Sequence, residues 1–262
     1  MLKRPKTCIT STCFELSEES NRYVQCAKNL ISSNLKYTDF DILLLTNKKE
    51  DFNDVNHARV KIINYFDFFN EPIVSGKRFN MHLKRYPLKL CINYGYDIIY
   101  YNDCDCFIDG WDDYSFQNKI KEDFDVFFVS HSDPQLGGLR RQYKHFQEII
   151  DTELCGLYTE DMDLAPNPAE TRVIFKNNEK LSSFLLFWDK ISNNNKDYFT
   201  YHDGVYLGTS AIYAKMKMSS IVRNDAFSKH CFIHHADGIL DCFGIRANLN
   251  EIKKEKINQI EE

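Results

Sequence analysis

The stretch YDIIYYNDCDCFIDGWDD, residues 96–113, is a run of apolar and aromatic residues that ends in two closely spaced carboxylates. Ile98–Tyr101 has the composition of a buried strand, and Asp103 and Asp105 follow it with Cys104 between them. Carboxylates this close repel each other and resist burial. The sequence therefore predicts either a positive charge beside the two acids or water all around them.

Strand-like and helix-like patterns alternate on both sides of this stretch. Continuous apolar runs are typical of strands buried on both faces of a parallel sheet, and apolar residues three and four apart are typical of helices. We expect strands at 7–14, 39–47, 60–66, 96–103, 123–131, 170–177 and 230–238. We expect helices at 22–35, 78–94, 142–150, 178–192 and 202–216. The alternation predicts an α/β fold with a mostly parallel sheet flanked by helices.

Two residues interrupt the helical pattern of 78–94 and its continuation. Pro87 lacks a backbone N–H, so we expect a kink or a new helix start there. Gly95 tolerates the left-handed conformation that commonly ends a helix, so we expect the helix to end at this residue.

Composition sets further limits. The 262 residues show no repeat and no linker-like change in composition, which predicts one domain over 1–250 and a charged tail over 251–262. Nine cysteines without a C-x-x-C pair predict reduced thiols in a cytoplasmic protein. A formal charge of -5 without a long basic run argues against a nucleic-acid partner. No apolar stretch approaches the roughly 20 residues of a membrane-spanning helix, so we expect a soluble protein.

The acid pair comes at the carboxyl end of its predicted strand, which is where open α/β sheets bind ligands. If the backbone stays extended, Asp103 and Asp105 point to one face of the strand, and Cys104 and Cys106 point to the other. Hard carboxylate oxygens suit Mn²⁺ or Mg²⁺, particularly where a phosphate supplies further ligands. The alternative is a pair of solvated loop acids.

The segment 85–109, RYPLKLCINYGYDIIYYNDCDCFID, resembles the nucleotide-sugar glycosyltransferases of GT-A fold. In that family a helix, a short turn and an apolar strand lead to a D-x-D motif, whose acids bind a divalent metal that bridges the donor diphosphate. The resemblance implies that Asp103 and Asp105 bind Mn²⁺ or Mg²⁺, with Asp105 as the firmer ligand. It also implies transfer of a sugar from a UDP- or GDP-sugar to a hydroxyl of a glycan, glycolipid or protein acceptor.

Two later segments extend the resemblance. HHADG, residues 234–238, is similar to the H-x-x-G of glycogenin-like retaining transferases, whose histidine is the third protein ligand of the metal. This implies that His235 is that ligand, while His234 points to the opposite face of a regular strand. The K-P-W that follows the glycine in those enzymes is replaced here by ILDCFG, so the stereochemistry stays open. Residues 170–191 look like the strand and helix that help to form the acceptor side.

Two acids are candidates for catalysis. Asp203 comes near the start of a predicted helix, where a carboxylate can cap free N–H groups. The family resemblance gives an acid at this place a second role, either as the base that takes the acceptor proton or as a partner of a sugar hydroxyl. Glu170, which precedes a predicted strand, is the second candidate.

Donor binding is expected from two groups of side chains. Lys77, Arg78 and Arg85 precede the metal strand and form either a solvated face or a partner for the donor diphosphate, for which Arg offers forked donors. In GT-A enzymes the end of the first strand holds the nucleotide base and ribose, and by positional analogy the residues here are Thr10, Ser11 and Thr12.

Three other functions fit parts of the pattern. A phosphohydrolase or phosphotransferase could use the first acid of a D-x-D motif as its nucleophile, but such motifs follow the first strand and have Thr or Val where Phe107 stands here. A nucleotidyltransferase would want a glycine-rich phosphate loop, which TCITSTCFELS does not contain. A non-catalytic binding protein of the same fold would have no need to keep an intact acid pair.

Overall fold

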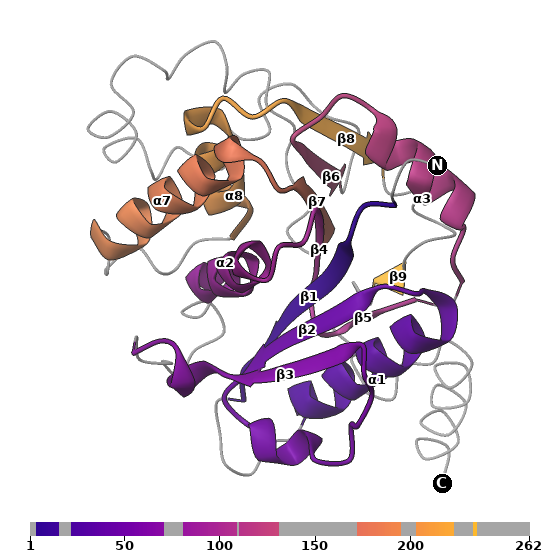
Figure 1. Ribbon diagram of the computed structural model, residues 1–262. Coiled ribbons are helices and arrows are strands. Elements are labelled where there is room, and N and C mark those ends of the chain that lie inside the picture. The colour runs from indigo at the N-terminus through magenta and orange to yellow at the C-terminus, as the bar shows by residue number, and fades with distance from the viewer. Residues whose placement is uncertain are drawn as a thin grey trace, which may run out of the picture.

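The computed structural model describes residues 4–15, 22–70, 81–108, 110–130, 172–194, 203–222 and 233–234 (Figure 1). These residues form a seven-stranded sheet in the order β3-β2-β1-β4-β7-β6-β8. Its strands are β1 (Thr7–Cys13), β2 (Asp41–Thr46), β3 (Val60–Asn64), β4 (Ile98–Asn102), β6 (Val126–Ser130), β7 (Arg172–Lys176) and β8 (Met218–Val222). Strand β7 is antiparallel to β4 and β6, and the other pairs are parallel. The predicted α/β class with a mostly parallel sheet is confirmed.

Helices cover both faces of the sheet (Figure 1). The α-helices are α1 (Arg22–Tyr37), α2 (Arg85–Asn93), α3 (Asp113–Lys121), α7 (Glu179–Asn194) and α8 (Asp203–Tyr213). The 3-10 helices are η1 (Lys49–Phe52), η2 (Tyr65–Asp67) and η3 (Met81–Lys84). Helices α1 and α3 pack on one face, and α2, α7 and α8 pack on the other.

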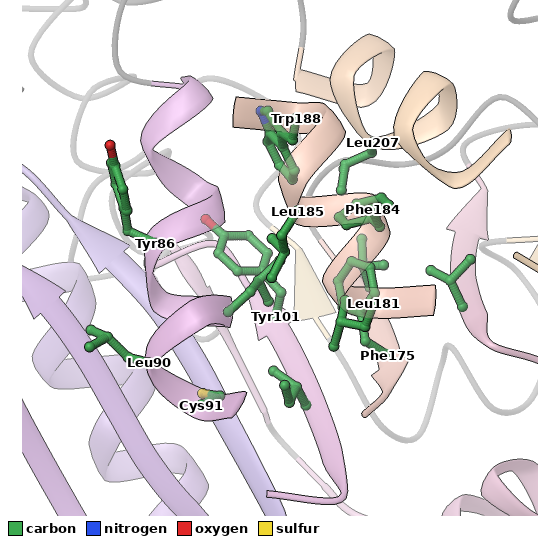
Figure 2. Packing of buried hydrophobic residues seen from close by; sticks show 14 of the residues in the cluster. Tyr86, Leu90, Cys91, Tyr101, Phe175, Leu181, Phe184, Leu185, Trp188 and Leu207 are labelled. Atoms are coloured by element: carbon green, nitrogen blue, oxygen red, sulfur yellow. The ribbon is translucent and has the colours of Figure 1, made fainter. Parts of the chain in front are cut away.

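The core on the second face is rich in aromatic side chains. Figure 2 shows residues of α2, α7 and α8 packed around β4 and β7, with Trp188 and Phe184 of α7 edge to face at 5.6 Å between ring centroids. Tyr101 of β4 belongs to this cluster and is 3% exposed. Burial of such large apolar side chains is the main driving force for docking these helices. The packing also brings α2 and its preceding turn η3 close to β1.

The segment before β4 ends as predicted and begins differently. Gly95 adopts φ +69°, and the N–H groups of Tyr96 and Gly95 donate to the carbonyls of Cys91 and Ile92, which is a Schellman motif. Residues 81–84 form a 3-10 turn, and α2 starts at Arg85, so Pro87 lies in the first turn, where its missing N–H costs no helix hydrogen bond.

Helix α3 and strand β8 were not predicted from the sequence, and two predicted segments fall outside the described residues. Helix α3 starts after Asp112, whose side chain caps it by accepting a hydrogen bond from the N–H of Ser115 at 3.1 Å. Strand β8 is short and half polar, so its pattern is weak. The predicted helix at 142–150 and the tail 251–262 lie outside the described residues.

A second, two-stranded sheet joins segments that are far apart in the sequence. Strand β5 (Cys106–Phe107) pairs antiparallel with β9 (Ile233–His234), and Cys106 lies opposite His234 in the register. Strand β9 is the described part of the strand that we expected at 230–238. The pairing brings Ile233 and His234, which directly precede His235 in the sequence, beside the residues that follow the acid pair.

The carboxylate of Asp125, the residue before β6, links three segments of the chain. Replacing this carboxylate should destabilise the fold. The Asp125 side chain, 14% exposed, accepts hydrogen bonds from Lys180 Nζ at 2.7 Å, Asn178 Nδ2 at 2.8 Å and the Lys217 N–H at 2.6 Å. Burial alone would raise the pKa of Asp125, but these hydrogen bonds outweigh it and lower that pKa. We expect Asp125→Asn to reduce the free energy of unfolding in urea by about 1–3 kcal/mol at pH 7.

The pH dependence gives a second measurement. Because the folded pKa of Asp125 is lowered, its stabilisation is present above the unfolded value of about 3.9 and is lost as pH falls through the folded value. The difference between wild type and Asp125→Asn should therefore shrink below about pH 4. Asp123→Asn is the control, since this neighbouring side chain is 89% exposed and should change stability little. Equal losses in both variants would contradict the prediction.

Candidate functional site

The candidate site lies at the carboxyl edge of β1 and β4. These strands are neighbours and parallel, with Thr10 opposite Tyr101. Strand β1 therefore delivers Thr12 to the same edge at which β4 delivers Asp103. The topology thus brings together Thr12 and Asp103, two predicted site residues that lie far apart in the sequence.

The backbone does not stay extended through the acid pair. The N–H of Cys106 donates to the carbonyl of Asp103 at 2.9 Å, so the chain makes a tight turn with Cys104 and Asp105 at its centre. The alternation of side chains that an extended strand would impose is therefore absent at these residues. Cys104 points inward and is 7% exposed, while Asp105 is half-buried.

A positive charge does lie beside the acids, and it belongs to Lys84. Its ammonium Nζ is 2.7 Å from Oδ1 of Asp103, and the two side chains are 10% and 20% exposed. The same oxygen accepts a hydrogen bond from the hydroxyl of Tyr101 at 3.1 Å. That hydroxyl lies 3.2 Å from Oγ1 of Thr12. The four side chains form a continuous polar cluster, which we call the Lys84–Asp103 cluster.

Sequence reasoning missed Lys84 and Tyr101. Tyr101 has the pattern of an ordinary strand residue, and Lys84 stands in a helical segment next to the arginine that the sequence favoured as a donor ligand. The ring of Tyr101 also lies under the Lys84 ammonium, 5.6 Å from it, in a cation–π arrangement. The close spacing of Asp103 and Asp105 indicated that a cation or water lies beside them, but it did not indicate which residue would supply the cation.

Of the three hydroxyl residues at the end of β1, Thr12 is the one that reaches the Lys84–Asp103 cluster. Thr10 is fully buried and donates to the carbonyl of Leu43 at 2.9 Å. Ser11 is 1% exposed, and its hydroxyl lies 3.5 Å from the carbonyl of Thr12.

Arg85 lies in the interior and joins two helices. Its guanidinium Nε donates to Asp189 of α7 at 2.6 Å, and its NH2 group donates to the hydroxyl of Tyr86 at 2.9 Å. Lys89 binds the other oxygen of the same Asp189 carboxylate at 2.5 Å. Arg85 is 1% exposed, so contact between this residue and the diphosphate of the sugar donor would require these bonds to rearrange. That contact stays a prediction.

Asn102, the last residue of β4, is a buried amide. It is 1% exposed, and within the described part of the chain neither its Oδ1 nor its Nδ2 has a hydrogen-bond partner. An unsatisfied buried polar group costs about 1–3 kcal/mol, so such groups are rare and call for an explanation. Asn102 precedes Asp103 directly, so this energetically unfavourable buried amide lies beside the candidate site.

The cysteines near the acids are buried thiols. Six cysteines in the described residues are free: Cys8, Cys13, Cys26, Cys91, Cys104 and Cys106. A hydrogen bond with Cys13, burial and the charge of Asp105 raise the pKa of Cys104 well above its usual value. This thiol therefore stays protonated at neutral pH, which suits packing and opposes a role as a nucleophile.

Of the remaining predicted site residues, the structure describes the backbone of one, and the others lie outside the described residues. Asp203 is the first residue of α8, as its helix-start position predicted. Glu170, Lys77, Arg78 and His235 lie outside the described residues, although His235 follows His234 of β9 directly in the sequence. Within the described ranges no group of three or more His, Cys, Asp or Glu side chains is arranged to hold a metal ion.

The acid pair nevertheless fits a divalent metal in its donor chemistry. A half-buried and a largely buried carboxylate belong to one turn, and both offer hard oxygens of the kind that Mn²⁺ and Mg²⁺ bind. The ion pair of the Lys84 ammonium with Asp103 shows that this carboxylate already stabilises a positive charge. The pair supplies at most part of a coordination sphere, so further ligands must come from a bound anion, from water or from other residues.

The N-terminus of α1 cannot serve as a phosphate site in this conformation. Glu15, 4% exposed, accepts hydrogen bonds at Oε1 from the N–H groups of Tyr23 and Val24 in the first turn of the helix. In dinucleotide-binding sheets these N–H groups bind the pyrophosphate. Here a carboxylate of the chain itself takes that place.

Comparison with known proteins adds no evidence on function. A scan against protein-family models and a search of curated proteins gave no match. In the described part of the chain, no helix combines the length and apolar character needed to cross a bilayer.

Proposed function

We propose that this protein is a metal-dependent glycosyltransferase of GT-A type. It transfers a sugar from a UDP- or GDP-sugar to a hydroxyl of a glycan, glycolipid or protein acceptor. The observation that carries the proposal is the placement of the acid pair on a turn at the carboxyl edge of β4, beside the end of β1 and beside the β9 segment. This is the edge at which open α/β sheets bind their ligands.

The chain supplies the binding functions that such a reaction needs. Asp103 and Asp105 would hold Mn²⁺ or Mg²⁺, with His235 as a third ligand. When bound, the metal supplies Lewis-acid stabilisation of the negative charge that develops on the nucleoside diphosphate leaving group. Lys84 places a second cation at the same edge, 2.7 Å from Asp103. Thr12 and the neighbouring end of β1 would contact the nucleoside.

Asp203 is the proposed base. It would take the proton of the acceptor hydroxyl if the reaction proceeds with inversion, or bind a sugar hydroxyl if it does not. Asp203 is the first residue of α8, and in this proposal one carboxylate would serve both the helix terminus and the substrate. Glu170 is the alternative.

A thermal melt with nucleoside diphosphates tests the donor site. UDP or GDP with Mn²⁺ should stabilise the folded protein, because a ligand that binds only the folded state shifts unfolding by mass action. At a concentration about 100 times the dissociation constant, the melting temperature should rise by about 5 °C or more. The control is the same nucleotide with EDTA. No shift with either nucleotide at millimolar concentration would reject the donor site.

A further inference from the structure

Lys84 and Asp103 form an ion pair that water scarcely reaches. The ammonium is 2.7 Å from the carboxylate, and the exposed fractions of the two side chains are 10% and 20%. Opposite charges at this separation attract each other far more strongly near a protein interior than in water. The first acid of the pair is therefore neutralised by a cation of the chain itself.

A divalent cation that binds Asp103 must compete with this ammonium. Both need the Asp103 carboxylate, and two positive charges in one partly buried place repel each other. The affinity for the bare metal is thus lowered by the fraction of molecules in which Asp103 is released from Lys84. A lysine can give up this contact without a change in backbone, because its ammonium sits on a flexible four-carbon stem.

We propose that Lys84 is a built-in competitor of the metal and that a diphosphate anion relieves the competition by accepting its ammonium. This inference rests on the proposed function, since the diphosphate is that of the sugar donor. Once Lys84 has turned to a phosphate, Asp103 keeps the hydrogen bond from Tyr101, 3.1 Å away, and stays oriented for the metal. Metal and diphosphate then strengthen each other's binding, and linkage requires the same factor in both directions.

The physical consequence is that the metal and the donor bind as a pair. Bare Mn²⁺ binds weakly because Lys84 occupies Asp103. A diphosphate without metal also binds weakly, because taking the ammonium would remove the positive charge of Lys84 from the partly buried Asp103 carboxylate. Together the two ligands satisfy both side chains.

Titration of Mn²⁺, followed by the electron paramagnetic resonance of the free ion, tests this coupling. Wild type should bind Mn²⁺ at least about tenfold more tightly with UDP or GDP than without. Lys84→Met, which keeps the length of the side chain but removes its charge, should bind bare Mn²⁺ about tenfold more tightly than wild type and show a smaller nucleotide effect, of which only the part due to direct ligation of the metal by the diphosphate remains. Lys84→Arg, which keeps the charge, should still disfavour bare Mn²⁺.

Lys89→Met is the matched control. Lys89 is also in an ion pair, with Asp189 at 2.5 Å, and it makes no ion pair with the acids of the turn in the described structure. It should leave both Mn²⁺ affinities unchanged. Circular dichroism verifies folding, and Lys84→Gln replaces Lys84→Met if the methionine variant does not fold.

The outcomes separate the inference from the proposed function. Equal affinities of wild type and Lys84→Met for bare Mn²⁺ would overturn the inference, and a normal nucleotide effect in wild type would then leave the donor site standing. A nucleotide effect of the same size in both proteins would also overturn it. Tighter bare Mn²⁺ binding by Lys84→Met with no nucleotide effect in any variant would keep the competition but reject both its relief and the proposed function.

Discussion

Asp105→Ala should abolish the Mn²⁺-dependent binding of a nucleoside diphosphate while leaving the protein folded. The side chain is half-buried at the centre of a turn, and the turn is closed by backbone atoms of Asp103 and Cys106 at 2.9 Å. Removing its carboxylate therefore takes away the proposed metal ligand but no backbone hydrogen bond of the turn. Because Lys84 competes for the other acid, Asp103 alone should not retain the metal. Calorimetric titration of UDP or GDP with Mn²⁺ measures the loss.

Asp39→Ala is the control for this experiment. Asp39 precedes β2 at the opposite edge of the sheet, and its side chain is 66% exposed. It removes the same charge from the protein and should not alter nucleotide binding. His235→Ala should weaken the metal less than Asp105→Ala does, since the two acids and the diphosphate still hold the ion. If Asp105→Ala binds Mn²⁺ and nucleotide as well as wild type, the acids are ordinary turn residues and the proposed mechanism fails.

Asp203→Asn should lower turnover by about a hundredfold or more, the scale expected for loss of a general base. Asparagine is nearly isosteric and caps helices as well as aspartate does, so α8, which starts at this residue, should keep its stability. Donor binding should also stay close to normal, because the substitution leaves the acid pair intact. Turnover is measured as transfer to an acceptor, or as slow donor hydrolysis while the acceptor is unknown.

Glu170→Gln decides between the two candidate bases. If Asp203→Asn retains full turnover and Glu170→Gln loses it, Asp203 is a helix-terminal residue and Glu170 takes the proton. If both variants lose nucleotide binding as well as turnover, the effect lies in donor binding and neither result identifies a base. A melt of each variant separates loss of folding from loss of chemistry.

The local elements could be predicted because their causes are local. The apolar run of β2 has five buried residues in succession, which the continuous pattern required, and Gly95 ends α2 because glycine adopts its positive φ without strain. The acid pair was visible for the same reason, since two carboxylates one residue apart need a cation or water wherever they lie.

The partners of these elements could not be predicted, because they depend on the order of the strands. Parallel pairing of β1 with β4 carries Thr12 to Tyr101, and the docking of η3 and α2 carries Lys84 to Asp103. No periodicity records these contacts, which join residues far apart in the chain. The turn at Asp103 also replaced the extended backbone that the strand pattern suggested.

The sequence by itself determined the α/β class, the strand that leads to the acid pair and the need of those acids for either a positive charge or water. The tertiary structure alone decided that the charge is Lys84, that Glu15 closes the start of α1, and that β9 lies beside the turn. The reason is physical: secondary structure follows from the chemistry of neighbouring residues, whereas the field at a carboxylate depends on every charge that packing brings within a few ångströms.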